Sequence, residues 1–175
     1  INTSDPGGTE LGKELERLMK QKYHDSISAD VELFLFNVCR LHLVKEVIQP
    51  SLRKGKVVLC DRFIDSTRAY QGYGRKQDVK AVRAICDFAS QSLLPDMTLL
   101  FDISAAQGLD RVTDRARRAG HVPLEDRFER EHLKFHEIIR SGYLALAEED
   151  SDRFKIIDAS GDVAAVHREV CMHLE

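Results

Sequence analysis

Three short apolar runs, separated by longer helical patterns, constrain the fold of this chain more than any other feature. The first run, at 56–61, follows Gly55 and ends in a charged residue, and similar runs cover 97–103 and 154–158. Apolar residues at helical spacing predict helices near 11–19, 29–51, 77–92, 105–118, 130–148 and 162–174. Strands that alternate with helices are typical of a parallel sheet with helices on both faces, so we predict an α/β fold.

The carboxyl ends of the predicted strands carry polar side chains. Asp61 and Arg62 close the first run, and Asp102 lies near the end of the second. In open α/β sheets, ligands bind beyond the carboxyl ends of the strands. Topology alone therefore predicts a ligand site around these residues.

The helical pattern at 29–51 is apolar on more than one face, because Phe34 and Phe36 add to a stripe that includes Val31 and Val38. We expect this helix to be largely buried. Upstream of it, proline and paired glycines predict a loop at 5–9. Residues 2–6 are polar and interrupted by proline, so no buried strand is expected there.

Composition restricts the class of protein. The chain has 175 residues and no internal repeat or linker, so we expect a single domain over 1–175. The formal net charge of −3 gives no global basic field for binding nucleic acid. Four scattered cysteines indicate reduced thiols instead of a disulfide framework. No apolar run is long enough to span a bilayer and no signal peptide is visible, so a cytoplasmic protein is expected.

The segment 61–72 carries the most specific chemistry. Arg62 at a strand end offers a fork of donors that suits a phosphate, and the neighbouring Asp61 suits Mg²⁺ or its waters. Ser66, Tyr70 and Gln71 add hydroxyl and amide groups that can contact a base or a sugar. From spacing alone, a surface loop with an Asp–Arg ion pair explains the segment equally well.

The order of motifs along nearly the whole chain resembles the bacterial form of the thymidylate kinase family. The motifs that carry the resemblance are Asp61-Arg62-Phe63 with Ser66 and Ala69-Tyr70-Gln71-Gly72, the loop Thr3 to Thr9, Leu35 to Arg40, Asp126 to Glu129, and Ile157-Asp158-Ala159. The resemblance implies the fold of a nucleoside-monophosphate kinase with a phosphate-binding loop (P-loop). It also implies phosphoryl transfer from Mg·ATP to dTMP, and a homodimer formed through the helix at 29–51 and its neighbours.

The resemblance also implies roles on the dTMP side. Phe36 matches the ring that stacks on thymine, and Arg40 matches the arginine that donates to a thymine carbonyl. Four residues apart, they are neighbours on one helix face. Without the other motifs, a core aromatic residue and a solvated helix charge would explain this pair. The remaining matches are Arg62 to the phosphate, Asp61 to Mg²⁺, Ser66 and Gln71 to the base side, Tyr70 to the sugar, and Asp5 to a position that is more often glutamate.

The stretch at about 115–127 resembles the lid that closes over ATP. Its guanidinium groups would neutralise the charge of the transferring phosphoryl group. On its own, the stretch also fits a basic solvated helix end. The lid residues are Arg115, Arg117 and Arg118, with catalytic roles implied, followed by Arg127 and Glu129.

The phosphate loop of the family is expected before Ile1, so we expect the chain to lack the first strand and this loop, and to be inactive on its own. The one near-match, which runs from Gly7 to Glu14, has Glu14 where the loop needs a Mg²⁺-binding hydroxyl. Residues 2–6 also do not read as the required buried strand. A second departure is Ser4, where the family usually has arginine.

The expected function is an ATP-dependent kinase that converts dTMP to dTDP in dTTP biosynthesis. Its expected partners are dTMP, ATP as co-substrate, Mg²⁺ and a second copy of the chain, with no nucleic acid and no membrane. Two alternatives remain open at this point. One is a nucleotide-binding regulatory paralogue without phosphoryl transfer, and the other is a deoxynucleoside kinase.

Overall fold

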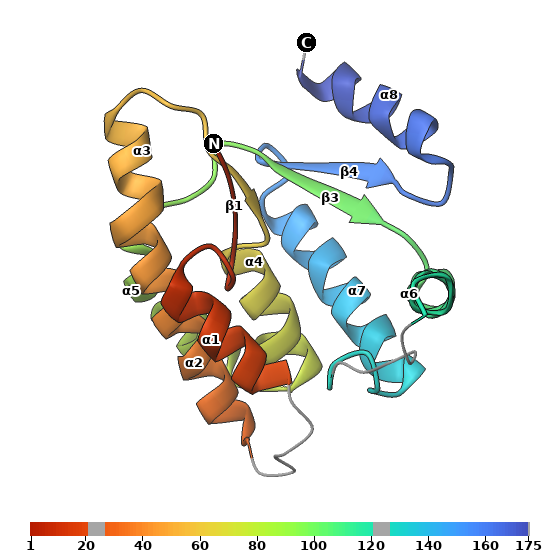
Figure 1. Cartoon of the computed structure of the whole chain (residues 1–175), viewed down its shortest axis with the longest axis horizontal. Helices are drawn as coiled ribbons and strands as arrows, with labels where there is room; N and C mark the ends of the chain where they lie inside the picture. Colours follow the sequence, from red (N-terminus) through yellow and green to blue (C-terminus); the bar gives the residue numbers. More distant parts are fainter. Residues whose placement is uncertain (21–26, 121–126, 175) are drawn as a thin grey trace. The chain divides into compact units, whose positions relative to one another are not determined.

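The computed structural model describes residues 1–20, 27–120 and 127–174, and its strands pair in parallel (Figure 1). The chain divides into two compact units, Ile1–Leu94 and Pro95–Glu175. Each unit contains one two-stranded parallel sheet, β1–β2 in the first and β3–β4 in the second. The α/β class and the parallel pairing predicted from the sequence are confirmed. The single domain over 1–175 stays a prediction.

Helices dominate the N-terminal unit. Ser28 begins α2 (Ala29–Leu43), because its hydroxyl oxygen accepts a hydrogen bond from Val31 N at 3.3 Å. The pattern predicted at 29–51 continues without a turn through the π-helix η1 (Val44–Ile48) into α3 (Gln49–Arg53). The other elements are β1 (Asn2–Ser4), α1 (Glu10–Lys20), β2 (Leu59–Asp61), α4 (Ile64–Thr67), the π-helix η2 (Arg68–Gly74) and α5 (Val79–Ser90).

Strand β1 lies in the segment 2–6, where no buried strand was expected, and its three residues are exposed or half-buried. Its residues pair with Leu59–Asp61, and Asp5 N extends the pairing by donating to Asp61 O at 3.0 Å. Backbone hydrogen bonds make this strand despite its polar side chains. Strand β2 is also less buried than predicted, with Leu59 64% exposed, because in this unit it has a neighbour on one side only.

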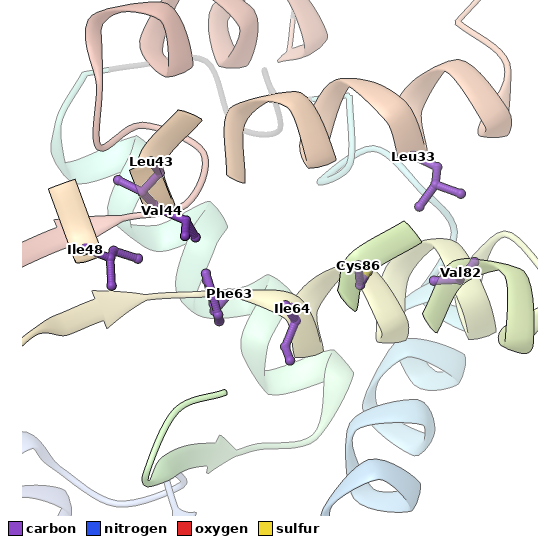
Figure 2. Close-up of a cluster of buried hydrophobic side chains, with 8 residues drawn as sticks. All are labelled: Leu33, Leu43, Val44, Ile48, Phe63, Ile64, Val82 and Cys86. Carbon is purple, nitrogen blue, oxygen red and sulfur yellow. The ribbon is translucent and has the colours of Figure 1, made fainter. Parts of the chain in front are cut away.

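The core of the N-terminal unit forms where α2, η1, α4 and α5 meet. Figure 2 shows the eight buried side chains of this cluster, which are Leu33, Leu43, Val44, Ile48, Phe63, Ile64, Val82 and Cys86. The expectation that the helix at 29–51 is buried on several faces is wrong. Val31, Phe34 and Val38 are about half exposed and lie on one outer face of α2, at positions i, i+3 and i+7.

The C-terminal unit contains the second sheet and three helices. Strands β3 (Thr98–Asp102) and β4 (Phe154–Asp158) pair from Thr98↔Phe154 to Asp102↔Asp158. Helix α7 (Leu133–Glu149) packs on both strands, α8 (Val163–Leu174) packs on β4, and α6 (Ala105–Arg118) packs on α7. The helices and strands predicted in this half are confirmed to within three residues. No helix in the described part of the chain could span a membrane.

Candidate functional site

Arg62 follows β2 in an uncommon backbone conformation. Its φ is 65°, in the left-handed region that costs a residue with a Cβ about 1–3 kcal/mol. Cys60 Sγ donates to the Arg62 carbonyl oxygen at 3.0 Å, which helps to hold this turn. Burial raises the pKa of the Cys60 thiol to about 12, so it stays protonated as a donor. Such strain persists where the surroundings over-determine it, and it clusters at functional sites.

The π-helix η2 follows immediately and brings Tyr70 to Arg62. The Arg62 guanidinium carbon lies 5.4 Å from the centre of the Tyr70 ring, within cation–π distance. A wider π turn is itself frequent at functional sites, because it redirects side chains that an α-helix would place elsewhere. Neither α4 nor η2 was expected from the sequence. Arg62 and Asp61 are exposed, whereas Tyr70 is half-buried.

Arg40 is buried and forms the centre of a hydrogen-bond network. It is 1% exposed, and its Nε donates to Asp5 Oδ2 at 2.7 Å. One terminal nitrogen donates to Asn37 Oδ1 at 3.0 Å. The other donates to Thr67 Oγ1 at 2.7 Å and to the Phe63 carbonyl at 3.2 Å. The guanidinium therefore ties the first loop and the 63–67 turn to α2, and a base carbonyl would have to replace one of these partners.

Asp5 has one oxygen in this network and one outside it. Its Oδ1 is buried and has no hydrogen-bond partner among the described residues. Burial raises the pKa of Asp5 above its ordinary value, although the neighbouring Arg40 and, more weakly, Arg62 favour the charged form. An unsatisfied buried acceptor beside Arg62 is the kind of group that a ligand donor can satisfy.

Gln71 is buried against α2 and is not on an open surface. It is 1% exposed, and its Nε2 donates to Glu32 Oε1 at 2.6 Å. Glu32 is 0% exposed and also accepts from Arg75, with Nε to Oε1 at 3.3 Å and a terminal nitrogen to Oε2 at 3.4 Å. Sequence reasoning missed Glu32. Its signal was an acidic residue inside an apolar helix, where a charge needs a partner.

The two remaining dTMP-side candidates, Phe36 and Ser66, are half-buried. Phe36 lies on α2, one turn before Arg40, and Ser66 lies in α4. All seven dTMP-side residues, and Asp61 beside them, belong to the N-terminal unit, on the loop after β1, on α2, and on the stretch from β2 to η2.

In the C-terminal unit, Arg140 and Arg111 organise the strand ends. Arg140 on α7 makes a bidentate pair with Asp102, at 2.7 and 2.8 Å, and its hydrogen bonds hold the pKa of Asp102 below its usual value. Arg111 on α6 donates to the carbonyls of Ala159 at 2.7 Å and Ser160 at 2.9 Å. Arg111 therefore clamps the loop that follows β4.

The lid expected at about 115–127 is described only in part, because residues 121–126 lie outside the described ones. Arg115, Arg117 and Arg118 occupy the last turn of α6, where basic side chains favour the helix dipole. A surface depression next to them is lined by Arg111, Asp114, Arg115, Arg118 and Ala119. Arg127 stacks on the Phe128 ring at 4.6 Å, and Glu129 is half-buried.

A candidate site for Mg²⁺ consists of a single carboxylate and not of a cluster of ligands. Among the residues that the structure describes, no three His, Cys, Asp or Glu side chains gather as a metal cage. Mg²⁺ usually keeps several waters and binds one or two carboxylates together with substrate phosphates. The exposed Asp61, next to Arg62 at the end of β2, fits that requirement.

The near-match to a phosphate loop follows β1 and opens α1, but β1 is not the buried strand that a phosphate loop requires. Gly12 lies inside α1, and a Cβ there would collide with the Pro6 carbonyl oxygen, so its glycine serves close packing. Lys13 pairs with Glu10 at 2.6 Å and Glu14 with Arg17 at 3.2 Å, both on the surface. The missing hydroxyl at Glu14 still separates this turn from a working phosphate loop.

Comparison with known proteins gives a consistent result. The thymidylate kinase family model matches residues 1–170. A thymidylate kinase of Syntrophus aciditrophicus (strain SB) is 47% identical over 173 residues, which are 99% of this chain and 79% of the relative. Another, from Desulfovibrio desulfuricans, is 50% identical over 160 residues, 91% of this chain and 74% of the relative. A third, from Desulfosudis oleivorans, is 40% identical over 175 residues, 100% and 82% of the two chains.

Proposed function

The chain belongs to the thymidylate kinase family, and we propose on this premise that it transfers the γ-phosphate of ATP to dTMP, giving dTDP for dTTP biosynthesis. The structural observation that supports specific residues for this function is the conformation of the turn after β2. There a strained Arg62 lies beside Asp61 and over the Tyr70 ring, at the strand end where α/β folds bind ligands.

On the monophosphate side, Arg62 grips the dTMP phosphate through its fork of donors. Phe36 stacks on thymine, Ser66 and Gln71 contact the base, and Tyr70 packs under the sugar, where a 2′-hydroxyl would collide. Asp5 offers its unsatisfied Oδ1 to a substrate donor. Arg40 donates to a thymine carbonyl by exchanging one of its internal acceptors, and otherwise holds the loop that carries Asp5.

On the phosphoryl-donor side, Asp61 would hold Mg²⁺ through the waters of the ion, which would supply charge neutralisation to the phosphates. Arg115, Arg117 and Arg118 of the lid stabilise the charge that spreads over the transferring group, and Arg127 and Glu129 close the lid. No covalent intermediate is needed, because two nucleotides held in line react directly.

We also propose that the protein works as a cytoplasmic homodimer. The half-exposed apolar stripe of Val31, Phe34 and Val38 on α2 supports the second copy, since an unpartnered apolar helix face favours burial against a partner. Neither alternative function, the inactive paralogue or the deoxynucleoside kinase, gains support from a specific observation.

The test is an ADP-release assay on the intact protein, including any segment before Ile1, with Mg·ATP and, separately, dTMP, thymidine and dUMP. We expect dTMP to be the preferred acceptor. Equal or better use of thymidine would favour a deoxynucleoside kinase and overturn the proposal. Binding of dTMP without ATP turnover would instead identify a regulatory paralogue.

A further inference from the structure

We propose that Glu32 is a positioning residue that locks the side-chain amide of Gln71 in one orientation and thereby selects a base with a donor at N3, thymine, over cytosine. The inference rests on the proposed function, because it places Gln71 against the base. The proposal gives a role to the buried Glu32 carboxylate on α2, a group that has no part in the function proposed above.

The orientation of the amide follows from its partner. A carboxylate only accepts hydrogen bonds, so the atom of Gln71 that lies 2.6 Å from Glu32 Oε1 has to be the donor Nε2. The other end of the amide is then the acceptor Oε1. That oxygen accepts no hydrogen bond from the part of the chain that the structure describes.

The surroundings make this lock rigid. Glu32 and Gln71 are 0% and 1% exposed, so water cannot easily replace either partner. Arg75 donates to both oxygens of Glu32, at 3.3 and 3.4 Å, and keeps the carboxylate in place. Rotating the amide would set Oε1 against a carboxylate oxygen, which is a repulsive contact between two acceptors in a buried site.

The consequence for the base is a choice between two hydrogen-bond patterns. Thymine carries a donor at N3, which a fixed Oε1 accepts. Cytosine carries a lone pair at N3, which faces Oε1 with no proton between them. A freely rotating amide would instead turn Nε2 toward cytosine. Selectivity therefore depends on Glu32 as much as on Gln71.

The test is the ratio of kcat/KM for dTMP to kcat/KM for dCMP. In Glu32→Gln the new amide can either accept from or donate to Gln71, so both orientations become available. We expect the ratio to fall by about tenfold or more, mainly through better use of dCMP. A merely structural role would lower both values together and leave the ratio unchanged, and that result would overturn the proposal.

The matched control is Glu14→Gln, which removes the same charge from an exposed Glu–Arg pair on α1 and should leave the ratio unchanged. The swapped pair Glu32→Gln with Gln71→Glu restores one carboxylate and one amide in the same volume. Position 71 then again presents only acceptors, so the ratio should recover toward that of the wild type. If the double variant folds but its dTMP/dCMP ratio does not recover, the proposed role of Glu32 is contradicted.

Wild-type protein provides a readout that does not depend on any variant folding or on turnover. In its nitrogen–proton NMR spectrum, we expect the Gln71 carboxamide to show one proton shifted downfield by Glu32 and protected from exchange. Two protons at the shifts of a solvated carboxamide, both exchanging rapidly with water, would overturn the lock even if the kinase activity is present. Loss of dTMP turnover in the wild type, with the shifted proton present, would contradict the proposed function instead.

Discussion

At the scale of single residues, the turn after β2 combines strain with a chemical role. Arg62 keeps a left-handed backbone at a position where glycine would be unstrained, while its side chain lies over Tyr70. The proposed contact of the guanidinium with the dTMP phosphate would explain why the chain retains this costly residue. Stability and activity should therefore separate at this position.

Replacing Arg62 with glycine tests that separation. We expect Arg62→Gly to be as stable as the wild type or more stable, by up to about 1 kcal/mol. The relieved strain stabilises the folded state, and it offsets the stability lost because glycine adds entropy to the unfolded chain. Activity with dTMP should fall by orders of magnitude, about 100-fold or more. Denaturant unfolding and the ADP-release assay measure the two effects. A variant that loses stability and keeps activity would show that Arg62 is structural.

The buried pair of Arg40 and Asp5 makes a second prediction at this scale. Arg40→Met leaves the Asp5 carboxylate buried without a partner, so we expect a loss of about 3–5 kcal/mol in the free energy of unfolding. Adding Asp5→Asn removes the orphaned charge and should recover part of that loss. Urea denaturation of the two single variants and the double variant measures the coupling. Additive losses would mean that the two groups do not depend on each other.

At the scale of elements, arginines join helices to the ends of the strands in the C-terminal unit. Arg140 connects α7 to β3 through Asp102, and Arg111 connects α6 to the loop after β4. Each helix therefore sets the position of a strand end by charge-assisted hydrogen bonds as well as by packing. The Asp102 pair also makes the unit sensitive to acid.

The sign of this acid sensitivity follows from the pKa of Asp102, which is lower in the folded protein than the ordinary 3.8. The pair stabilises the fold above that pH, and its contribution is lost as the pH falls through the folded pKa. We expect Asp102→Asn to lower the Tm at pH 7, and the gap from the wild type to narrow below pH 3.8. Thermal scans of both proteins, with the exposed Asp96→Asn as control, test this. A gap that widens in acid would contradict the assignment.

At the scale of the whole molecule, we propose that the outer face of α2 binds a second copy. Phe34 is 57% exposed between Val31 and Val38, although the helix also carries buried residues of the main cluster in Figure 2. One helix thus serves the core on one face and presents apolar surface on another. Substitutions on the outer face should change association and leave the fold intact.

Phe34→Glu tests this division. We expect the variant to shift from dimer to monomer in analytical ultracentrifugation, because a charge would be buried in an apolar interface. Its circular dichroism spectrum should stay that of the wild type. Val163→Glu on α8 makes the same change at another exposed apolar residue and should not alter the mass. A dimeric Phe34→Glu variant would place the interface elsewhere.

The sequence by itself determined the longer helices, the apolar strands and the family. Apolar spacing predicted α1, α2, α5 to α8, and the three apolar strands, because local periodicity reflects which face each element buries. The order of the Asp61-Arg62-Phe63, Tyr70-Gln71-Gly72 and loop motifs identified the family. These signals are local or ordered along the chain, so they need no coordinates.

Only the tertiary structure decided the polar networks. Strand β1 exists because its backbone pairs with β2, and nothing in its polar side chains predicts this. Asp5, a partner of Arg40, lies 35 positions away along the chain, and the contact between Glu32 and Gln71 spans 39 positions. Hydrogen bonds between distant residues leave no periodic trace in a sequence. The residue types of the candidate site could therefore be proposed from the sequence, while the atoms that hold Gln71 and Arg40 in place could not.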